Sequence, residues 1–304
     1  MAFDVDDFPW EQADPRGFTQ AFVRVRGGSV PILLVHGWPE TARIWWRVIA
    51  PLADAGFDVI APDLRGFGRS EVGPDGFHDV ASHALDLSAL MRHLGHERFV
   101  AVGGDLGGPI IQDLALREPE RVDRMVLFNS PLPFDKERMQ GMRTRPPAES
   151  ADYFIRQGTD PDGLAAELDT PDKRRRYVAT FYGPRFWAHP GAFDAEAVAF
   201  LTEPFGDGAK LRASFGAYES VFRSEARAEP PRIGRNEATE TMILFGPSDH
   251  VIYPDFDRMA AEVFPNHVGP FLLRDCGHFV QWEAARPLTT AVLTFCRDLL
   301  ASQS

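Results

Sequence analysis

The chain has 304 residues, of which 44% are hydrophobic and 25% charged, a balance typical of a globular protein with a sizeable packed core. Its net charge of −12 and isoelectric point near 5.2 argue against the basic surface that nucleic-acid binding requires. No apolar stretch approaches the roughly 20 residues of a membrane-spanning helix, and residues 1–16 lack the apolar segment of a secretion signal. We expect a soluble, cytoplasmic protein with no nucleic-acid or membrane partner.

Only two cysteines are present, Cys276 and Cys296. Two thiols cannot form a disulfide framework, and this spacing matches no common zinc motif. We therefore expect two buried thiols and no metal site. The sequence leaves the oligomeric state open, a homodimer included.

Short apolar runs alternate with longer amphipathic segments. We predict buried strands over Val30–Val35, Phe57–Pro62, Phe99–Gly103, Arg124–Asn129, Glu240–Phe245 and Gly269–Leu273. Between the second and third of these, Asp79–Leu94 carries its apolar residues at spacings of four and three, which is one face of a helix. Such alternation of strands and helices predicts an α/β fold with a mostly parallel, doubly wound sheet.

The alternation stops after Pro131. From residue 133 to about residue 236 the chain is rich in Arg, Pro, Asp, Phe and Tyr and shows no buried strand, while Gly163–Tyr177 and Lys210–Phe222 have helical patterns. A last amphipathic helix is predicted over Arg286–Leu300. We predict a sheet domain made of residues 1–132 and 237–304, interrupted by a helical insertion, residues 133–236.

Asp105 occupies a turn between a predicted strand and a predicted helix. It lies within Gly-Gly-Asp-Leu-Gly-Gly, so that small residues stand two before it and two and three after it. A side chain presented on a sharp turn from strand to helix needs such small neighbours. This is the pattern of a nucleophile elbow, G-x-S-x-G, with Asp in the serine position. The alternative is a tight turn in which Asp105 caps the helix.

Two further polar residues follow later strands. Asp249 comes just after Glu240–Phe245, and His278 comes just after Gly269–Leu273. Taken singly, Asp249 is a common turn former and His278 an ordinary loop residue. Together with Asp105 they stand in the chain order nucleophile, acid, histidine, which predicts a catalytic triad of the α/β-hydrolase type.

Two backbone amides are candidates for an oxyanion hole. His36-Gly37-Trp38-Pro39 follows the first buried strand, so the N–H of Trp38 could join the N–H of Leu106, the residue after Asp105. The glycine-containing loop Asp63–Ser70 is predicted to pack beside the site in a structural role.

With these motifs in place, the sequence resembles the α/β-hydrolase-fold epoxide hydrolases and, more distantly, the haloalkane and haloacetate dehalogenases. The resemblance covers nearly the whole chain. It is carried by HGWP at 36–39, DLRGFGRS at 63–70, GGDLGG at 103–108, GPSD at 246–249 and GH at 277–278. It implies the α/β-hydrolase fold with a helical cap inserted after the sixth strand.

An aspartate in the serine position changes the expected chemistry. A carboxylate attacks a saturated carbon and forms an alkyl ester on the enzyme. His278, oriented by Asp249, would then activate the water that hydrolyses this ester, and the amides of Trp38 and Leu106 would hold the oxyanion. Water is the co-substrate, so neither a metal nor an organic cofactor is expected.

Resemblance to the epoxide hydrolases implies two cap tyrosines that donate to the epoxide oxygen. Tyr153 and Tyr218 match the two donor positions, although cap tyrosines often only pack. The many aromatic residues of the insertion suggest an apolar, possibly aryl, epoxide, and Trp38, Phe154 and Trp187 are expected to contact it. The expected product is a vicinal diol.

A dehalogenase is the alternative enzyme. The haloalkane and haloacetate dehalogenases carry Trp or Arg directly after the nucleophile, where this chain has Leu106; Trp38, Trp187 and Trp282 remain as candidate halide donors. Epoxide hydrolases commonly have His-Asp-Trp where this chain has Gly-Asp-Leu, so the usual substrate preferences need not apply. A third alternative is a non-catalytic ligand-binding homologue.

Overall fold

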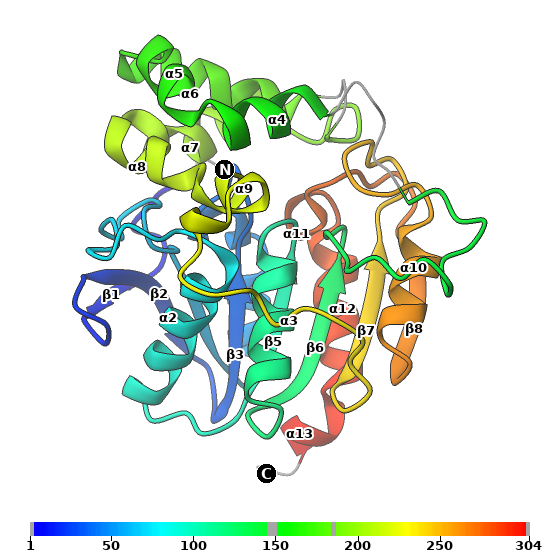
Figure 1. The fold of residues 1–304 in the computed structure, drawn as a ribbon. Coiled ribbons are helices and arrows are strands. Elements are labelled where there is room, and N and C mark those ends of the chain that lie inside the picture. Colours follow the sequence, from blue (N-terminus) through cyan, green and yellow to red (C-terminus); the bar gives the residue numbers. More distant parts are fainter. Residues whose placement is uncertain (1–2, 145–150, 184–186, 302–304) are drawn as a thin grey trace.

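The computed structural model describes residues 3–144, 151–183 and 187–301. Its centre is an eight-stranded sheet in the order β1-β2-β4-β3-β5-β6-β7-β8 (Figure 1). The strands are β1 (Trp10–Ala13), β2 (Gln20–Arg26), β3 (Val30–Val35), β4 (Phe57–Pro62), β5 (Phe99–Gly104), β6 (Val122–Phe128), β7 (Glu240–Phe245) and β8 (His267–Leu272). In the sheet, β4, β3, β5, β6, β7 and β8 run parallel to one another. β2 pairs antiparallel with β4 on one side and with β1 on the other.

The sequence patterns located six of these strands but not β1 and β2. β1 has only four residues, two of them polar, and β2 carries three charged or amide side chains among its seven residues. Neither strand therefore has the continuous apolar run of a strand buried on both faces. β4 and β5 do have such runs, and every one of their residues is buried. The predicted mostly parallel α/β sheet is confirmed.

Helices cover both faces of the sheet. α2 (Val80–His93) and α3 (Gly107–Arg117) pack side by side on one face, and α12 (Ala285–Phe295) lies on the other (Figure 1). α1 (Ile49–Asp54) packs against α12. The remaining core helices are η1 (Ala42–Trp45), α10 (Phe256–Val263), α11 (Val280–Glu283) and α13 (Arg297–Ala301). The predicted last helix is therefore interrupted at Cys296, between α12 and α13.

A group of short helices lies between β6 and β7 in the sequence and over the carboxyl ends of the strands in space (Figure 1). They are α4 (Ala151–Thr159), α5 (Pro161–Glu167), α6 (Pro171–Ala179), η3 (Thr180–Tyr182), α7 (Ala195–Thr202), η4 (Glu203–Gly206), α8 (Gly208–Ser214), α9 (Gly216–Phe222) and η5 (Ser224–Ala226). This is the cap expected after the sixth strand. Its predicted limits, residues 133 and 236, stay a prediction, and residues 145–150 within them lie outside the described residues.

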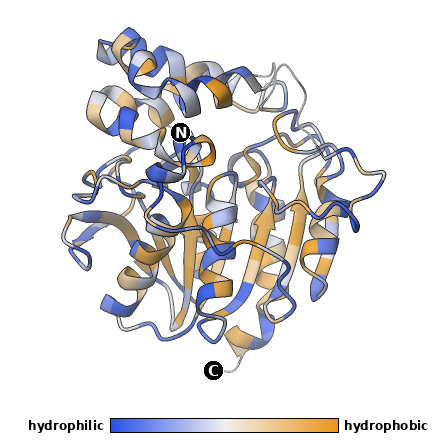
Figure 2. Ribbon diagram, viewed as in Figure 1, coloured by the Kyte–Doolittle hydropathy of each residue, from blue (hydrophilic) through white to orange (hydrophobic). Residues whose placement is uncertain are grey.

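The cap helices are shorter than their patterns predicted. Gly163–Tyr177 is divided between α5 and α6, because Thr170 caps a new helix that begins at Pro171. Lys210–Phe222 is divided at Phe215 between α8 and α9. The strands of the sheet are coloured mainly as hydrophobic, whereas the cap helices mix both kinds of residue (Figure 2). No described helix is long and apolar enough to cross a membrane.

Candidate active site

Asp105 lies on the turn between β5 and α3 in the left-handed region, with φ of 45°. Its N–H donates to the carbonyl of Asn129 at 2.9 Å. The backbone here leaves no room for larger neighbours: a Cβ on Gly107 would come within 2.3 Å of the carbonyl oxygen of Val35, and a Cβ on Gly37 would come within 2.5 Å of the Asp105 Cβ. The glycines around Asp105 therefore permit the close approach of β3 and its following loop to the elbow.

His278 connects the two aspartates. Its Nδ1 donates to Oδ2 of Asp249 at 2.8 Å, and its Nε2 lies 3.2 Å from Oδ2 of Asp105. All three side chains are buried. Nε2 is thus the ring nitrogen that faces the candidate nucleophile. The structure thus brings the three residues predicted as a triad into a single contact chain.

The carboxylate of Asp249 is held by several donors. Its Oδ1 accepts hydrogen bonds from the amides of Val251 at 2.6 Å and Ile252 at 3.3 Å, and its Oδ2 accepts one from Nδ2 of Asn129 at 2.8 Å. The same Nδ2 donates to the carbonyl of Gly277, next to His278, at 3.1 Å. Asn129 therefore joins the loops that carry the acid and the histidine. The sequence analysis did not single it out; a polar residue directly after a buried strand was the available signal.

The proposed oxyanion hole is partly occupied by the aspartate itself. The N–H of Trp38 donates to Oδ1 of Asp105 at 2.7 Å. Leu106 follows Asp105 at the beginning of α3, where backbone amides have no partner within the helix. One oxygen of Asp105 thus points to the Trp38 amide and the other to His278.

His36 fixes the loop that carries Trp38. Its Nε2 accepts the N–H of Leu64 at 3.0 Å, and its Nδ1 donates to the carbonyl of Gly37 at 2.8 Å. Burial lowers the pKa of His36 to about 4, so the ring is neutral at pH 7, as this pattern of one acceptor and one donor requires. The loop Asp63–Ser70 thereby braces the candidate site through a backbone amide.

Glu40 is a second group that the sequence analysis missed. It is 2% exposed; its Oε2 accepts the N–H of Gly37 at 2.5 Å, and its Oε1 accepts a hydrogen bond from Nε2 of Gln281 at 2.7 Å. Burial, reinforced by the negative charge of Asp105, raises the pKa of Glu40 to about 8. The position three residues after Gly37, where a side chain can reach back to a free amide, could have identified it.

The charge state of His278 depends on both aspartates. Burial by itself would lower its pKa, but the charges and hydrogen bonds of Asp249 and Asp105 outweigh burial and raise the pKa well above 6.5. The two carboxylates therefore favour the protonated form of His278. Its affinity for a proton depends on Asp105 remaining charged.

The cap supplies two tyrosines above Asp105. The ring of Tyr153, on α4, stacks on the indole of Trp38 with centroids 5.9 Å apart, and the ring of Tyr218, on α9, meets the same indole edge-on at 5.6 Å. The two hydroxyls share a hydrogen bond. Burial raises the pKa of each tyrosine well above 10, with the charge of Asp105 adding to the effect, so both remain protonated donors.

Asp105, Tyr153 and Tyr218 line one cavity of about 530 Å³ between core and cap. Most of its other walls are apolar, including Leu106, Pro109, Leu132, Phe154, Val221, Ile233, Val251 and Ile252. Phe154, expected to contact substrate, lies on this wall. Trp38 and Trp187 lie behind it: Trp38 packs under Tyr153, and Trp187 meets the rings of Tyr153 and His278 at 5.1 and 4.6 Å.

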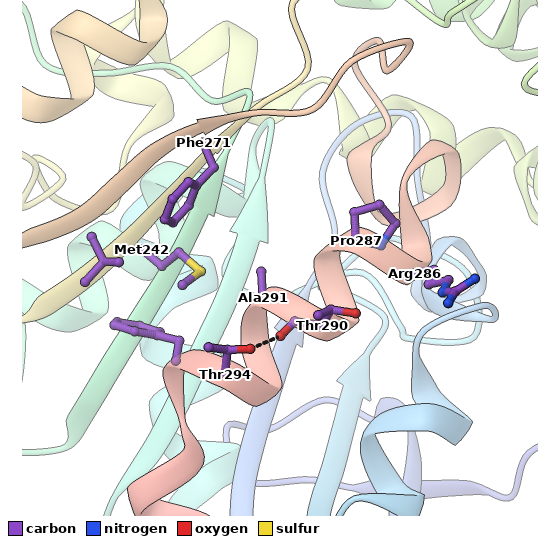
Figure 3. A pocket seen from close by; sticks show the side chains of 9 residues that line it. Met242, Phe271, Arg286, Pro287, Thr290, Ala291 and Thr294 are labelled. Carbon is purple, nitrogen blue, oxygen red and sulfur yellow. Dashed lines mark hydrogen bonds between the residues drawn. The ribbon is translucent and has the colours of Figure 1, made fainter.

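A second hollow of about 650 Å³ is open to solvent between β7, β8 and α12 (Figure 3). Its lining is Met242, Val268, Phe271, Arg286, Pro287, Thr290, Ala291, Thr294 and Phe295. None of these is a nucleophile or general base, and the hydroxyl of Thr294 is engaged by the Thr290 carbonyl at 2.8 Å. The chemistry therefore belongs to the cavity at Asp105. Among the described residues, no group of His, Cys, Asp or Glu side chains is arranged to hold a metal ion.

Comparisons with known proteins agree with this geometry. The α/β hydrolase fold family matches residues 30–285. The chain is 28% identical to the soluble epoxide hydrolase of Corynebacterium sp. (strain C12), over 95% of this chain and 97% of that protein. It is also 28% identical to haloalkane dehalogenase 2 of Mycobacterium tuberculosis (strain ATCC 25618 / H37Rv), over 88% of each chain. The structure of the epoxide hydrolase CorEH without ligand superposes with a TM-score of 0.82 at 25% identity, over 96% of this chain and all of that one.

Proposed function

The chain belongs to the α/β hydrolase fold family, and within that family we propose that it is an epoxide hydrolase that forms a covalent ester on Asp105. One observation carries the proposal: a buried aspartate on the nucleophile elbow, in contact with a histidine, faces two protonated tyrosines across an apolar cavity. Relatives of similar length named epoxide hydrolases support it.

In the first step, Oδ2 of Asp105 attacks one carbon of the epoxide ring and forms a C–O bond. The bond from that carbon to the ring oxygen breaks, and the oxygen accepts a proton from Tyr153 or Tyr218. The Trp38 amide already holds Oδ1 at 2.7 Å, which orients the carboxylate for this attack. The product is a hydroxyalkyl ester of Asp105 and a tyrosinate, and the tyrosinate takes back a proton that the His278 imidazolium releases to solvent.

In the second step, His278 acts as the base. Ester formation removes the negative charge of Asp105, one of the two charges that keep the pKa of His278 high, so the imidazolium gives up its proton more readily. Its Nε2 then accepts a proton from water, and the hydroxide attacks the ester carbonyl. The oxyanion forms where Oδ1 now accepts from Trp38, with the Leu106 amide as second donor. Collapse breaks the ester C–O bond, the departing alkoxide takes the proton of the new carboxyl group, and the diol leaves Asp105 as a carboxylate.

The contacts of the tryptophans argue against halide release. The indole N–H of Trp38 donates to Oγ of Ser214 at 3.1 Å and is not directed at the cavity. Trp282 packs among Phe3, Phe193 and Arg47, and it is not part of the cavity wall. Leu106 has no polar side chain. The two tyrosines, which line the cavity, are therefore better placed to stabilise an alkoxide than the indoles of Trp38 and Trp282 are to bind a halide.

A single-turnover experiment in ¹⁸O-labelled water tests the proposal. With enzyme in excess over styrene oxide, the covalent route places unlabelled oxygen from Asp105 in the diol and leaves ¹⁸O in the enzyme, where peptide mass spectrometry locates it. Direct attack by water would instead label the diol in the first turnover. Release of halide from matched haloalkanes, without any diol from epoxides, would assign the protein to the dehalogenases.

A further inference from the structure

Arg227 lines the cavity that contains Asp105, although it belongs to neither the triad nor the pair of tyrosines. It lies just after η5, at the beginning of the segment that leads from the cap back to β7. Its side chain is partly buried. An arginine in the wall of a mostly apolar cavity is costly to desolvate unless it has a partner.

The structure gives Arg227 an anchor but no counter-charge. Its Nε donates to the carbonyl of Ser220, on α9, at 2.5 Å. Arg212 and Arg223 nearby both pair with Glu219, whereas no ion pair among the described residues includes Arg227. The anchor fixes the direction of the guanidinium and leaves its two terminal nitrogens available.

Asp79 is the only other charged residue besides Asp105 on the described cavity wall, and it does not neutralise the arginine. It is 1% exposed; its Oδ1 accepts a hydrogen bond from Oγ of Ser82 at 2.5 Å, and its Oδ2 is buried away from solvent. Arg227 therefore presents the accessible positive charge of the cavity. Phe154, Val221 and Ile233 supply apolar wall in the same cavity.

We propose that Arg227 binds a carboxylate at the far end of the substrate, so that the preferred epoxides are amphipathic, with an apolar chain between the oxirane and a carboxylate. A guanidinium anchored at Nε presents two parallel donors, which match the two oxygens of a carboxylate. The apolar walls suit the chain between the two polar ends. The inference rests on the proposed function and narrows its substrate class.

A purely structural role is the competing explanation. Arg227 bonds a carbonyl near the end of α9, and basic side chains commonly stabilise helix C-termini in this way. Such a role would affect all substrates equally. A carboxylate-binding role affects only substrates that carry the charge.

The test compares a terminal epoxide of decanoate with the terminal epoxide of decanamide, which has nearly the same shape and no charge. We expect Arg227→Gln to lower kcat/KM for the carboxylate about tenfold, mainly through KM, and to leave the amide unchanged. Arg232→Gln is the matched control, because Arg232 is an exposed arginine of the same segment that does not line the cavity. Arg232→Gln should leave kcat/KM unchanged for both epoxides.

If Arg227→Gln lowered kcat/KM equally for both epoxides, or if the wild type did not prefer the carboxylate, the inference would be overturned. Diol formation in the same assays would still uphold the proposed function. Binding of decanoate and decanamide, measured by calorimetry, separates the two ideas if neither epoxide is turned over. If Arg227→Gln alone then weakened decanoate binding about tenfold, the carboxylate site would be supported and the proposed epoxide hydrolase activity rejected. Equal binding of the two ligands would reject the site.

Discussion

The core and the cap hold their parts of the candidate site in different ways. In the core, Asp249 accepts hydrogen bonds from the side chain of Asn129 and the amides of Val251 and Ile252, and it fixes His278 at Nδ1. In the cap, Tyr153 and Tyr218 are placed mainly by aromatic rings packed on Trp38.

This difference matches what each group is proposed to do. An attacking carboxylate and a base must be aligned closely with the reacting atoms, and hydrogen bonds from a buried backbone provide that alignment. A tyrosine that donates to the epoxide oxygen tolerates more variation in position. Packing of its ring sets the distance of its hydroxyl from that oxygen but does not fix one hydrogen-bond angle. We infer that the core holds the nucleophile and the base, whereas the cap holds the proton donors to the epoxide oxygen.

Asp105→Ala, which removes the proposed nucleophile of the core, should have the largest effect on diol formation. Without the nucleophile no ester forms, so diol production should fall by at least about a thousandfold. Product assays on styrene oxide measure this, with circular dichroism as the check on folding, because alanine at a positive φ costs about 1 kcal/mol. Diol formation near the wild-type rate would exclude Asp105 as the nucleophile.

Tyr218→Phe and Tyr153→Phe test the cap half. Each single change leaves one donor to the epoxide oxygen, so we expect alkylation of Asp105 to slow by about ten- to a hundredfold, and the double variant to lose far more. Rapid-quench measurement of the ester isolates this step from hydrolysis. Tyr177→Phe is the control, since its hydroxyl bonds Gln157 and it is not part of the cavity wall. A double variant no slower than either single one would contradict a shared role.

Asp105→Asn should lower the pKa of His278, since it removes one of the two carboxylates that raise it. A pH titration of the imidazole ¹⁵N shifts compares the variant with the wild type. A raised folded pKa stabilises the fold below the unfolded value, and that contribution is lost as pH rises through the folded pKa. The variant should therefore lose less stability on the alkaline side. An unchanged titration would undermine the proposed switch from acid to base.

Glu40→Gln should change how stability depends on pH. The folded pKa of about 8 lies above the ordinary 4.5, so between these values the folded protein binds a proton that the unfolded chain does not. The contribution of Glu40 to the free energy of unfolding therefore falls as pH rises from about 4.5 to about 8. Chemical denaturation at several pH values should show a shallower decline in the glutamine variant. Parallel curves for the two proteins would mean that Glu40 is already ionised in the fold.

The smallest expected effect concerns the hydrogen bond that joins Trp38 of the core to Ser214 of the cap. Ser214→Ala leaves the buried indole N–H of Trp38 without its partner, so we expect a loss of about 1–3 kcal/mol of unfolding free energy. Urea denaturation measures it. Ser220→Ala, which removes only a bond to Ala217 within α9, provides the comparison. Equal losses in the two variants would show that the contact between Trp38 and Ser214 adds nothing specific.

The sequence by itself determined the parallel sheet and the order of its chemical groups. Strands buried on both faces require continuous apolar runs, and a strained elbow requires small residues around Asp105. Both features can therefore be recognised in short stretches of the sequence. The chain order then predicted that Asp249 and His278 would meet Asp105 at the carboxyl ends of the strands. β1 and β2 escaped detection because edge and antiparallel strands have no such run.

Only the tertiary structure decided which distant side chains share the cavity and what their charges are. The sequence did not connect Glu40 and Arg227 with Asp105: the raised pKa of Glu40 comes from burial beside Asp105, and Arg227 lies in the wall of the same cavity although it is 122 positions further along the chain. The protonation of His278 likewise depends on two carboxylates 144 positions apart in the chain, Asp105 and Asp249. Desolvation and charge act through space, so these properties exist only once the chain has folded.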